Sequence, residues 1–335
     1  MKADDYLWDG SGPPDPEVQR LEDLLRPLGH AGPEPRATPA RPRWAFGGLV
    51  PTLAAAASLA VALGGALLAG RLPAEGWDVT RLRPVADGRD RIAGKARLRV
   101  GEWLETDGTT RARVRVGRIG QVEVEPRTLV GLVDAGRRSH RLSLVRGTLH
   151  ASIWAPPGRF FVETPSAVAV DLGCAYTLEV DESGAGELRV ESGWVGFEYQ
   201  GRESFVPQGA RCVTRPGVGP GTPHYEDASP ALIESLTRLD FEGDGDRAAD
   251  LRVVLEHARR RDALSLWHLL ARARGGERTL VYERIAGLVA PPAGVTREGV
   301  LRGDREMLDA WWEELDLGSA DWWRLWKAPW PPRAR

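Results

Sequence analysis

Residues 44–70 carry no charged side chain, although the rest of the chain is polar and rich in arginine and acidic residues. A helix of about 20 apolar residues crosses the hydrocarbon core of a bilayer. We therefore predict a transmembrane helix over residues 44–70. A buried soluble helix is disfavoured because a helix of this length normally has a polar face. A signal peptide is disfavoured because such segments start closer to the N-terminus.

The charges that flank this stretch predict its orientation. Arg36, Arg41 and Arg43 precede it, whereas Arg71 stands alone just after it. Lysine and arginine are enriched on the cytoplasmic side of membrane helices. We therefore expect the N-terminus in the cytoplasm and everything beyond residue 70 outside it.

Residues 1–43 are predicted to be a short cytoplasmic tail with one amphipathic helix. Asp15 can cap this helix and Pro16 suits its first turn. A helix this short is marginal alone, so its apolar face is predicted to bind a partner. The candidate partner-binding residues on that face are Val18, Leu21, Leu24 and Leu25.

The middle of the chain shows the period-two alternation that is typical of strands. Residues 71–91 are predicted to be a linker, and residues 92–226 contain short alternating runs such as RARVRVGRIGQVEVEP, separated by Gly, Asp or Pro. Many short strands at this spacing indicate an all-β domain, either a sandwich or a β-solenoid of short strands.

Residues 227–335 are predicted to form a helical, tryptophan-rich domain, an all-α bundle. Segments such as SPALIESLTRL and DREMLDAWWEELDLG have apolar residues three and four apart. Tryptophans crowd the end of the chain, where they either fill a core or form an exposed aromatic surface. The candidate partner-binding residues here are Trp311, Trp322, Trp323 and Trp326. The predicted fold class is thus multi-domain, with a single transmembrane helix, an all-β domain and a C-terminal bundle.

Two cysteines, Cys174 and Cys212, lie on the predicted extracytoplasmic side, where disulfides are allowed. We predict a disulfide between them, with two free buried cysteines as the alternative.

The chain lacks the sequence signatures of catalysis. No H-E-x-x-H, G-x-S-x-G, Walker A or dinucleotide motif occurs, and the six histidines are scattered. We predict that the chain is not an enzyme, with no catalytic, cofactor-binding or metal-binding residues and no cofactor. A formal net charge of -2 gives no bulk attraction to nucleic acid, so no direct nucleic-acid partner is expected.

Degenerate motifs follow one another in a fixed order over residues 95–215. They are RVGEWLETDGTTRARVRVGRIGQVEVEPRTLV, LSLVRGTLHASI, RFFVETPSAVAVDLGCAYTLEV, LRVESGWVGFEYQ and FVPQGARC. In order and spacing this segment resembles the FecR family domain, found in bacterial inner-membrane regulators of cell-surface signalling. Gly173-Cys174 stands where that family usually has Gly-Thr.

The resemblance implies a single-pass protein of the bacterial inner membrane, with its C-terminal domains in the periplasm. It implies transmembrane signalling from a protein partner in the envelope to a cytoplasmic partner. That second partner would be an extracytoplasmic-function sigma factor, which the chain would restrain as an anti-sigma factor does. One alternative is a non-catalytic envelope scaffold or glycan- or protein-binding module without regulatory output. Another is a hydrolase of unknown type, for which the sequence offers no catalytic constellation.

Overall fold

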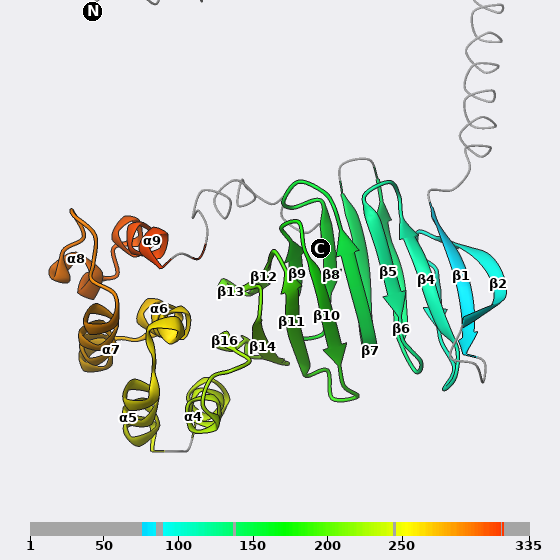
Figure 1. Cartoon of the computed structure of the whole chain (residues 1–335). Helices are drawn as coiled ribbons and strands as arrows, with labels where there is room; N and C mark the ends of the chain where they lie inside the picture. Colours follow the sequence, from blue (N-terminus) through cyan, green and yellow to red (C-terminus); the bar gives the residue numbers. More distant parts are fainter. Residues whose placement is uncertain (1–75, 85–89, 137–138, 244–245, 316, 318–335) are drawn as a thin grey trace, which may run out of the picture. The chain divides into compact units, whose positions relative to one another are not determined.

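The computed structural model describes residues 76–84, 90–136, 139–243, 246–315 and 317. The chain divides into two compact units, residues 1–72 and 73–335, and the described residues all belong to the second. In that unit sixteen described strands are followed by helices (Figure 1). The strands are β1 Gly76–Pro84, β2 Asp90–Arg99, β3 Trp103–Glu105, β4 Arg111–Val116, β5 Gly120–Val124, β6 Leu129–Ala135, β7 His140–Ile153, β8 Phe160–Glu163, β9 Val168–Asp171, β10 Ala175–Val180, β11 Gly186–Ser192, β12 Trp194–Tyr199, β13 Arg202–Pro207, β14 Ala210–Arg215, β15 Gly219–Pro220 and β16 His224–Tyr225.

The sheet folds over at strand β7, which belongs to both of its halves. The first part of β7 pairs with β6 and, in parallel, with β8, whereas its last part pairs with β5 and β10. Gly147 lies where the partners change, with a φ of 93°. Half A runs β2-β1-β4-β5-β7-β10-β11-β14, with β15 and β16 on β14. Half B runs β3-β6-β7-β8-β9-β12-β13, and every neighbouring pair except β7–β8 is antiparallel.

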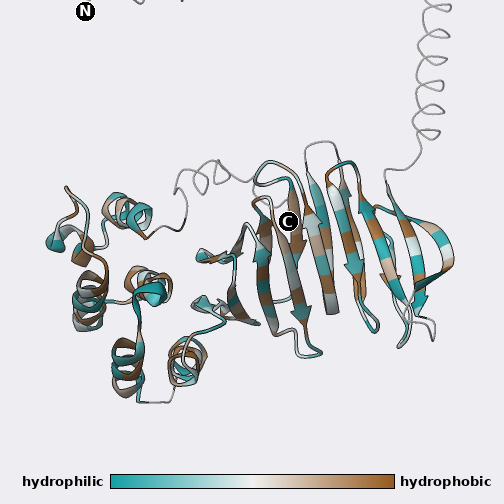
Figure 2. Ribbon diagram, viewed as in Figure 1, coloured by the Kyte–Doolittle hydropathy of each residue, from teal (hydrophilic) through white to brown (hydrophobic). Residues whose placement is uncertain are grey.

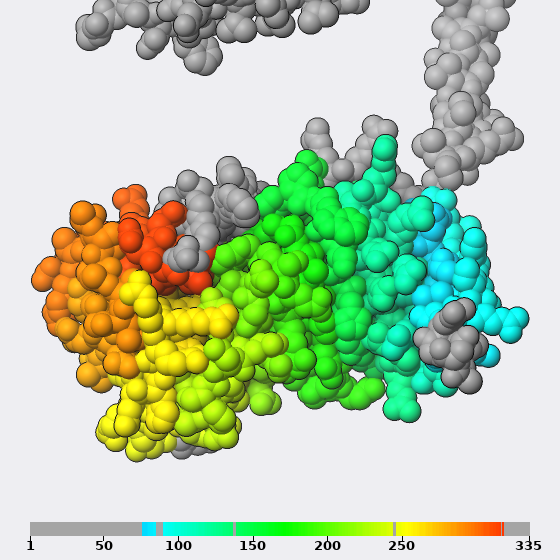
Figure 3. Space-filling view, in the orientation of Figure 1, coloured from blue at the N-terminus to red at the C-terminus, as the bar shows by residue number. Residues whose placement is uncertain are grey.

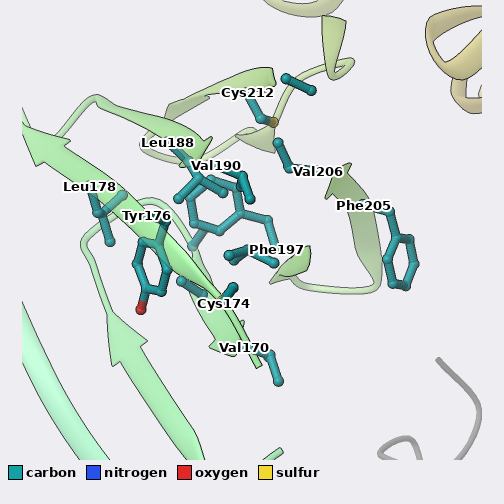
Figure 4. Packing of buried hydrophobic residues seen from close by; sticks show 14 of the residues in the cluster. Val170, Cys174, Tyr176, Leu178, Leu188, Val190, Phe197, Phe205, Val206 and Cys212 are labelled. Atoms are coloured by element: carbon teal, nitrogen blue, oxygen red, sulfur yellow. The ribbon is translucent and has the colours of Figure 1, made fainter. Parts of the chain in front are cut away.

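The alternation of the sequence places apolar side chains between the two halves. In β4 every second residue is buried, and apolar and polar residues alternate visibly along the strands (Figure 2). Trp77 of half A lies 6.4 Å from Phe160 of half B, measured between ring centroids. Large side chains such as Tyr176 and Leu188 fill the far end of the core (Figure 4).

Strand β1 lies inside the segment 71–91, for which the sequence predicts a linker. Its apolar side chains Trp77, Val79 and Leu82 are 2–7% exposed, so the strand completes the core of half A. β1 pairs with β4 on one side and β2 on the other.

The helices begin at side chains that accept backbone hydrogen bonds. Ser229, Asp246, Thr296 and Asp304 each cap the helix that follows them, as expected for residues that satisfy the free N–H groups of a first turn. The described helices are α4 Pro230–Phe241, α5 Arg247–His257, the 3₁₀ turn η2 Arg260–Asp262, α6 Ala263–Arg272, α7 Gly275–Leu288, α8 Arg297–Arg302 and α9 Arg305–Glu314.

The helical part packs against the outer face of half B. Trp312 of α9 lies 5.9 Å from Phe205 and 6.3 Å from Trp194, which face outward from β13 and β12. One cluster of buried apolar residues runs from Trp77 to Leu317. The space-filling view shows the helices, in yellow to red, in contact with the strands in green (Figure 3).

The predicted fold class is therefore wrong. The described residues form one large, mainly antiparallel sheet with a C-terminal helical part. The helices do not form a separate bundle, because they bury apolar side chains against the sheet. None of their helices is long and apolar enough to cross a membrane. The tail 1–43 and the stretch 44–70 lie outside the described residues. The domain limits and the cellular location remain predictions.

Candidate interaction surface

A buried acid and a buried thiol, Asp171 and Cys174, lie close together at the end of strand β9. The Cys174 thiol donates to Asp171 Oδ2 at 2.8 Å, and the Gly173 N–H donates to Asp171 Oδ1 at 2.7 Å. Burial raises the pKa of Asp171 to about 7, against the opposing effect of these hydrogen bonds. Burial, followed by the charge of Asp171, raises the pKa of the Cys174 thiol. The thiolate is the nucleophilic form of cysteine. Because its raised pKa keeps the Cys174 thiol protonated, this pair contributes to packing and is not suited to covalent chemistry.

Both cysteines are free thiols, so the predicted disulfide is not observed. The Cys212 thiol donates to the carbonyl of Gly221 at 3.3 Å, and burial raises its pKa to about 12. Cys174 precedes β10, and β11 separates β10 from β14, which holds Cys212. Two strand spacings are about 9.6 Å, and a disulfide needs Cα atoms within about 7 Å. The two side chains lie apart in the core (Figure 4).

A polar network joins the sheet to the helices. Asp240 of α4 accepts from Arg202 Nη2 at 2.6 Å and from Arg272 Nη1 at 3.4 Å. Arg272 Nη2 also donates to the carbonyl of Glu203 at 2.7 Å and to Ser204 Oγ at 2.6 Å. Burial lowers the pKa of Arg272 to about 10, and the charge of Asp240 opposes this. The charges of Asp240, Arg202 and Arg272 are thus paired with one another, and they link helices α4 and α6 to strand β13.

A cavity of about 270 Å³ lies beside this network. Its titratable lining residues are Arg202, Glu203, His268, Arg272, Arg305 and Asp309. Arg305 Nη2 lies 3.5 Å from Glu203 Oε2, so these two charges form an ion pair. Both ring nitrogens of His268 are hydrogen-bonded to backbone groups. The cavity thus lacks a nucleophile next to a base. In the part of the chain that the structure describes, no group of three His, Cys, Asp or Glu residues could hold a metal ion.

Of the tryptophans predicted to bind a partner, Trp311 lies in the core instead. Its side chain is 0% exposed, and its ring lies 5.5 Å from that of Tyr282. Trp311 faces the neighbouring helix because it shares the apolar face of α9 with Leu308, so it offers no surface to a partner. The other candidates lie outside the described residues: Val18, Leu21, Leu24, Leu25, Trp322, Trp323 and Trp326.

An exposed apolar surface, which we call the β3 patch, lies at the β3 edge of half B, opposite the β13 edge. It consists of Val100, Trp103 and Val133, which are 46%, 57% and 42% exposed. Trp103 pairs with Gly131, and a Cβ atom there would lie 2.8 Å from its indole ring. The N–H of Gly101 donates to the carbonyl of Leu132, which brings Val100 next to β6. The sequence alone does not reveal this patch: Trp103 lies in an alternating run, and such a run does not show which of its side chains stay exposed.

Comparison with known proteins leaves the family of this chain open. No family model and no curated protein matches the sequence. Two crystal structures of a candidate anti-sigma factor from Parabacteroides distasonis are similar over 41% of this chain, at 14% and 13% identity and TM-scores of 0.33 and 0.34. This chain spans 65% and 64% of their lengths.

Proposed function

We propose that this chain is a regulatory protein that acts by binding other proteins, and that the β3 patch contacts one of them. The observation that carries the proposal is Trp103, a large aromatic side chain that is 57% exposed on a paired strand beside Val100 and Val133. Exposed aromatic residues on a rigid base are typical anchors of protein interfaces. By contrast, Asp171, Cys174 and His268, whose pKa values are strongly shifted, are buried and hydrogen-bonded.

The regulatory part of the proposal is supported by the ordered FecR-like motifs over residues 95–215. We assign the contact with a sigma factor to the amphipathic segment that contains Val18, Leu21, Leu24 and Leu25. The β3 patch would then bind a second protein whose presence the chain reports. Such coupling requires two states that the two partners stabilise differently.

Photo-crosslinking in cells tests the β3 patch. A photoreactive phenylalanine analogue replaces Trp103 in one full-length variant and Trp154 in the other. Trp154 is a matched control, because it is 77% exposed and follows the far end of β7. We expect one dominant protein adduct at position 103 and none at 154. The same adducts at both positions, or none at 103, would contradict the proposal. An adduct with a glycan in place of a protein would favour the envelope scaffold.

The sigma-factor contact is tested separately. Full-length chain carrying Leu21→Asp and Leu25→Asp is compared with wild type for retention of purified extracytoplasmic-function sigma factors from the same organism. We expect wild type to retain one of them and the double variant to lose it. Failure of wild type to retain any would remove the sigma factor from the proposal and leave the β3 patch untouched.

A further inference from the structure

Strand β2 is a long edge strand with one side open. Its ten residues, Asp90–Arg99, pair only with β1 among the described strands. Leu98 is the one buried residue of the strand. β2 lies at the outer margin of the sheet (Figures 1 and 3). From Gly94 to Arg99 its register with β1 is regular, because the shift in pairing comes before Gly94.

The direction of the free backbone groups follows from Arg99. Its N–H donates to Glu102 Oε2 at 2.8 Å, and its carbonyl accepts from the Glu102 N–H at 2.9 Å. Both groups of Arg99 are thus engaged outside the ladder with β1. Backbone groups of successive residues point to opposite sides of an antiparallel strand. The N–H and C=O groups of Lys95 and Arg97 therefore also point to the open edge, whereas those of Ala96 and Leu98 point to β1.

The side chains of the same residues select what can pair there. Lys95, Arg97 and Arg99 alternate along β2, so they share one face of the sheet. Arg91 adds a fourth positive charge, and Asp90 is the one acidic residue of the strand. Two acidic neighbours offset part of this charge: Glu102 pairs with Arg99 at 3.2 Å, and Asp78 of β1 lies opposite Arg97. Like charges directly opposite each other destabilise a strand pair, whereas opposite charges stabilise it. A second copy of β2 is therefore disfavoured at this edge, and a strand with alternating acidic residues is favoured.

We propose that the open edge of β2 binds an extended acidic segment of another protein, which adds to half A as a further strand. The backbone of Lys95 and Arg97 would pair with the segment, and Lys95 and Arg97 would face its carboxylates, because the guanidinium of Arg99 is already paired with Glu102 at 3.2 Å. Strand addition of this kind takes its affinity from main-chain hydrogen bonds and its specificity from alternate side chains. The open edge of β2 belongs to half A and the β3 patch to half B, and the two adjoin only where Val100 follows Arg99. This inference therefore goes beyond the proposed function.

The test measures binding of a fluorescein-labelled peptide, Thr-Glu-Val-Glu-Val-Glu-Thr, to the full chain by fluorescence anisotropy at low ionic strength. A peptide with lysine in place of each glutamate has the same alternation and the opposite charge. We expect the acidic peptide to bind and the basic one not to bind. No binding of the acidic peptide, or equal binding of both, would overturn the proposal without bearing on Trp103.

Two substitutions at one position separate charge from strand pairing. Arg97→Ala removes one charge, and Arg97→Pro removes the same charge together with the outward N–H. An edge strand tolerates proline where its N–H faces solvent. We expect Arg97→Ala to weaken binding about threefold, as for one exposed ion pair. Arg97→Pro should weaken it about fivefold more, as for one further hydrogen bond. Equal affinities of the two variants would show attraction by charge alone and overturn the proposal.

Hydrogen exchange in the wild-type chain gives a readout that does not depend on whether the proline variant folds. We expect the amides of Lys95 and Arg97 to exchange several-fold more slowly with the acidic peptide than without it. Unchanged exchange at both amides, under conditions where the peptide is bound, would show that no strand is added.

Discussion

The Nε2 atom of His268 accepts a hydrogen bond from the backbone N–H of Phe205 at 3.0 Å. The other ring nitrogen, Nδ1, donates to the carbonyl of Leu264 at 2.8 Å. One neutral tautomer satisfies both contacts, and protonation would remove the acceptor. Because β13 is an edge strand of half B, the histidine closes part of that edge with helix α6.

This contact predicts a pH dependence of stability. Burial, followed by the charge of Arg272, lowers the pKa of His268 to about 3. An unfolded histidine titrates near pH 6.5. As pH falls below about 6.5, His268 binds a proton in the unfolded chain, whereas in the folded chain it stays neutral until about pH 3. His268 therefore costs stability increasingly in that window, by up to about 1.4 kcal/mol per pH unit.

Urea unfolding of His268→Gln checks this prediction. Glutamine keeps an acceptor but cannot titrate, and we expect a loss of about 1–3 kcal/mol at pH 7.5 from imperfect hydrogen bonds. The difference from wild type should shrink at pH 5, because only wild type pays the proton cost there. A difference that stays the same at both pH values would contradict the assigned neutral state.

Asp171 predicts a pH dependence of the opposite sign. Burial raises its pKa to about 7, whereas an unfolded aspartate titrates near pH 3.9. Between these values the folded chain holds a proton that the unfolded chain has released. Stability from this group is therefore present below about pH 4 and is lost as pH rises to about 7, at up to about 1.4 kcal/mol per pH unit.

Asp171→Asn isolates this effect, since an amide retains an acceptor for the Gly173 N–H and has no charge to bury. We expect the variant to become more stable relative to wild type between pH 5 and pH 8, measured by urea unfolding. Asp181→Asn is the control: Asp181 is an exposed turn residue whose pKa is lowered by its hydrogen bond from Ser183. A gain in the control equal to that of Asp171→Asn would rule out burial as the cause.

Local patterns in the sequence predict individual elements, because strands and helices leave their own periods. The run RARVRV predicts a strand, and β4 Arg111–Val116 lies there. Ser229 and Pro230 suit the start of a helix, and α4 Pro230–Phe241 begins there. Strand β1 was missed because charged residues and proline surround Trp77, Val79 and Leu82 in the segment predicted as a linker.

The candidate site could not be derived in the same way, because exposure depends on which elements cover one another. Trp103 and Trp311 both lie in patterned segments, yet the first is 57% exposed and the second 0%. That difference arises because helix α7 supplies Tyr282 beside Trp311, whereas Trp103 rests on Gly131 at a sheet edge. The pairing of His268 with Phe205 likewise joins residues far apart in the sequence and has no local signature.

The bend in β7 predicts that a side chain in place of Gly147 destabilises the fold. Its φ of 93° is a conformation that L-residues rarely adopt, and an added Cβ atom would lie 2.5 Å from Thr128 Cα. We expect Gly147→Ala to destabilise the fold by about 1–3 kcal/mol from backbone strain alone, measured by urea unfolding. Gly201→Ala is the matched control, since Gly201 also has a positive φ but its Cβ would meet no atom within 4 Å. Equal losses in both would remove the close approach to Thr128 as a cause.

The buried ion network predicts that breaking it is worse than removing it. The Asp240 side chain is 6% exposed and that of Arg272 is 20% exposed. Asp240→Leu leaves the guanidinium groups of both Arg272 and Arg202 without their carboxylate, and breaking a buried pair in this way costs about 3–5 kcal/mol. Adding Arg272→Met to that variant removes the more buried of the two stranded guanidinium groups and should restore part of the loss, since apolar replacements of buried ion pairs are often neutral. Urea unfolding of Asp240→Leu, Arg272→Met and the double variant measures the coupling between the two residues.

The exposed pair of Arg297 and Glu283 serves as the control, and Glu283→Ala should cost at most about 1 kcal/mol. If the double variant is no more stable than Asp240→Leu, Arg272 holds β13 through its bonds to Glu203 and Ser204, and the pairing with Asp240 is secondary.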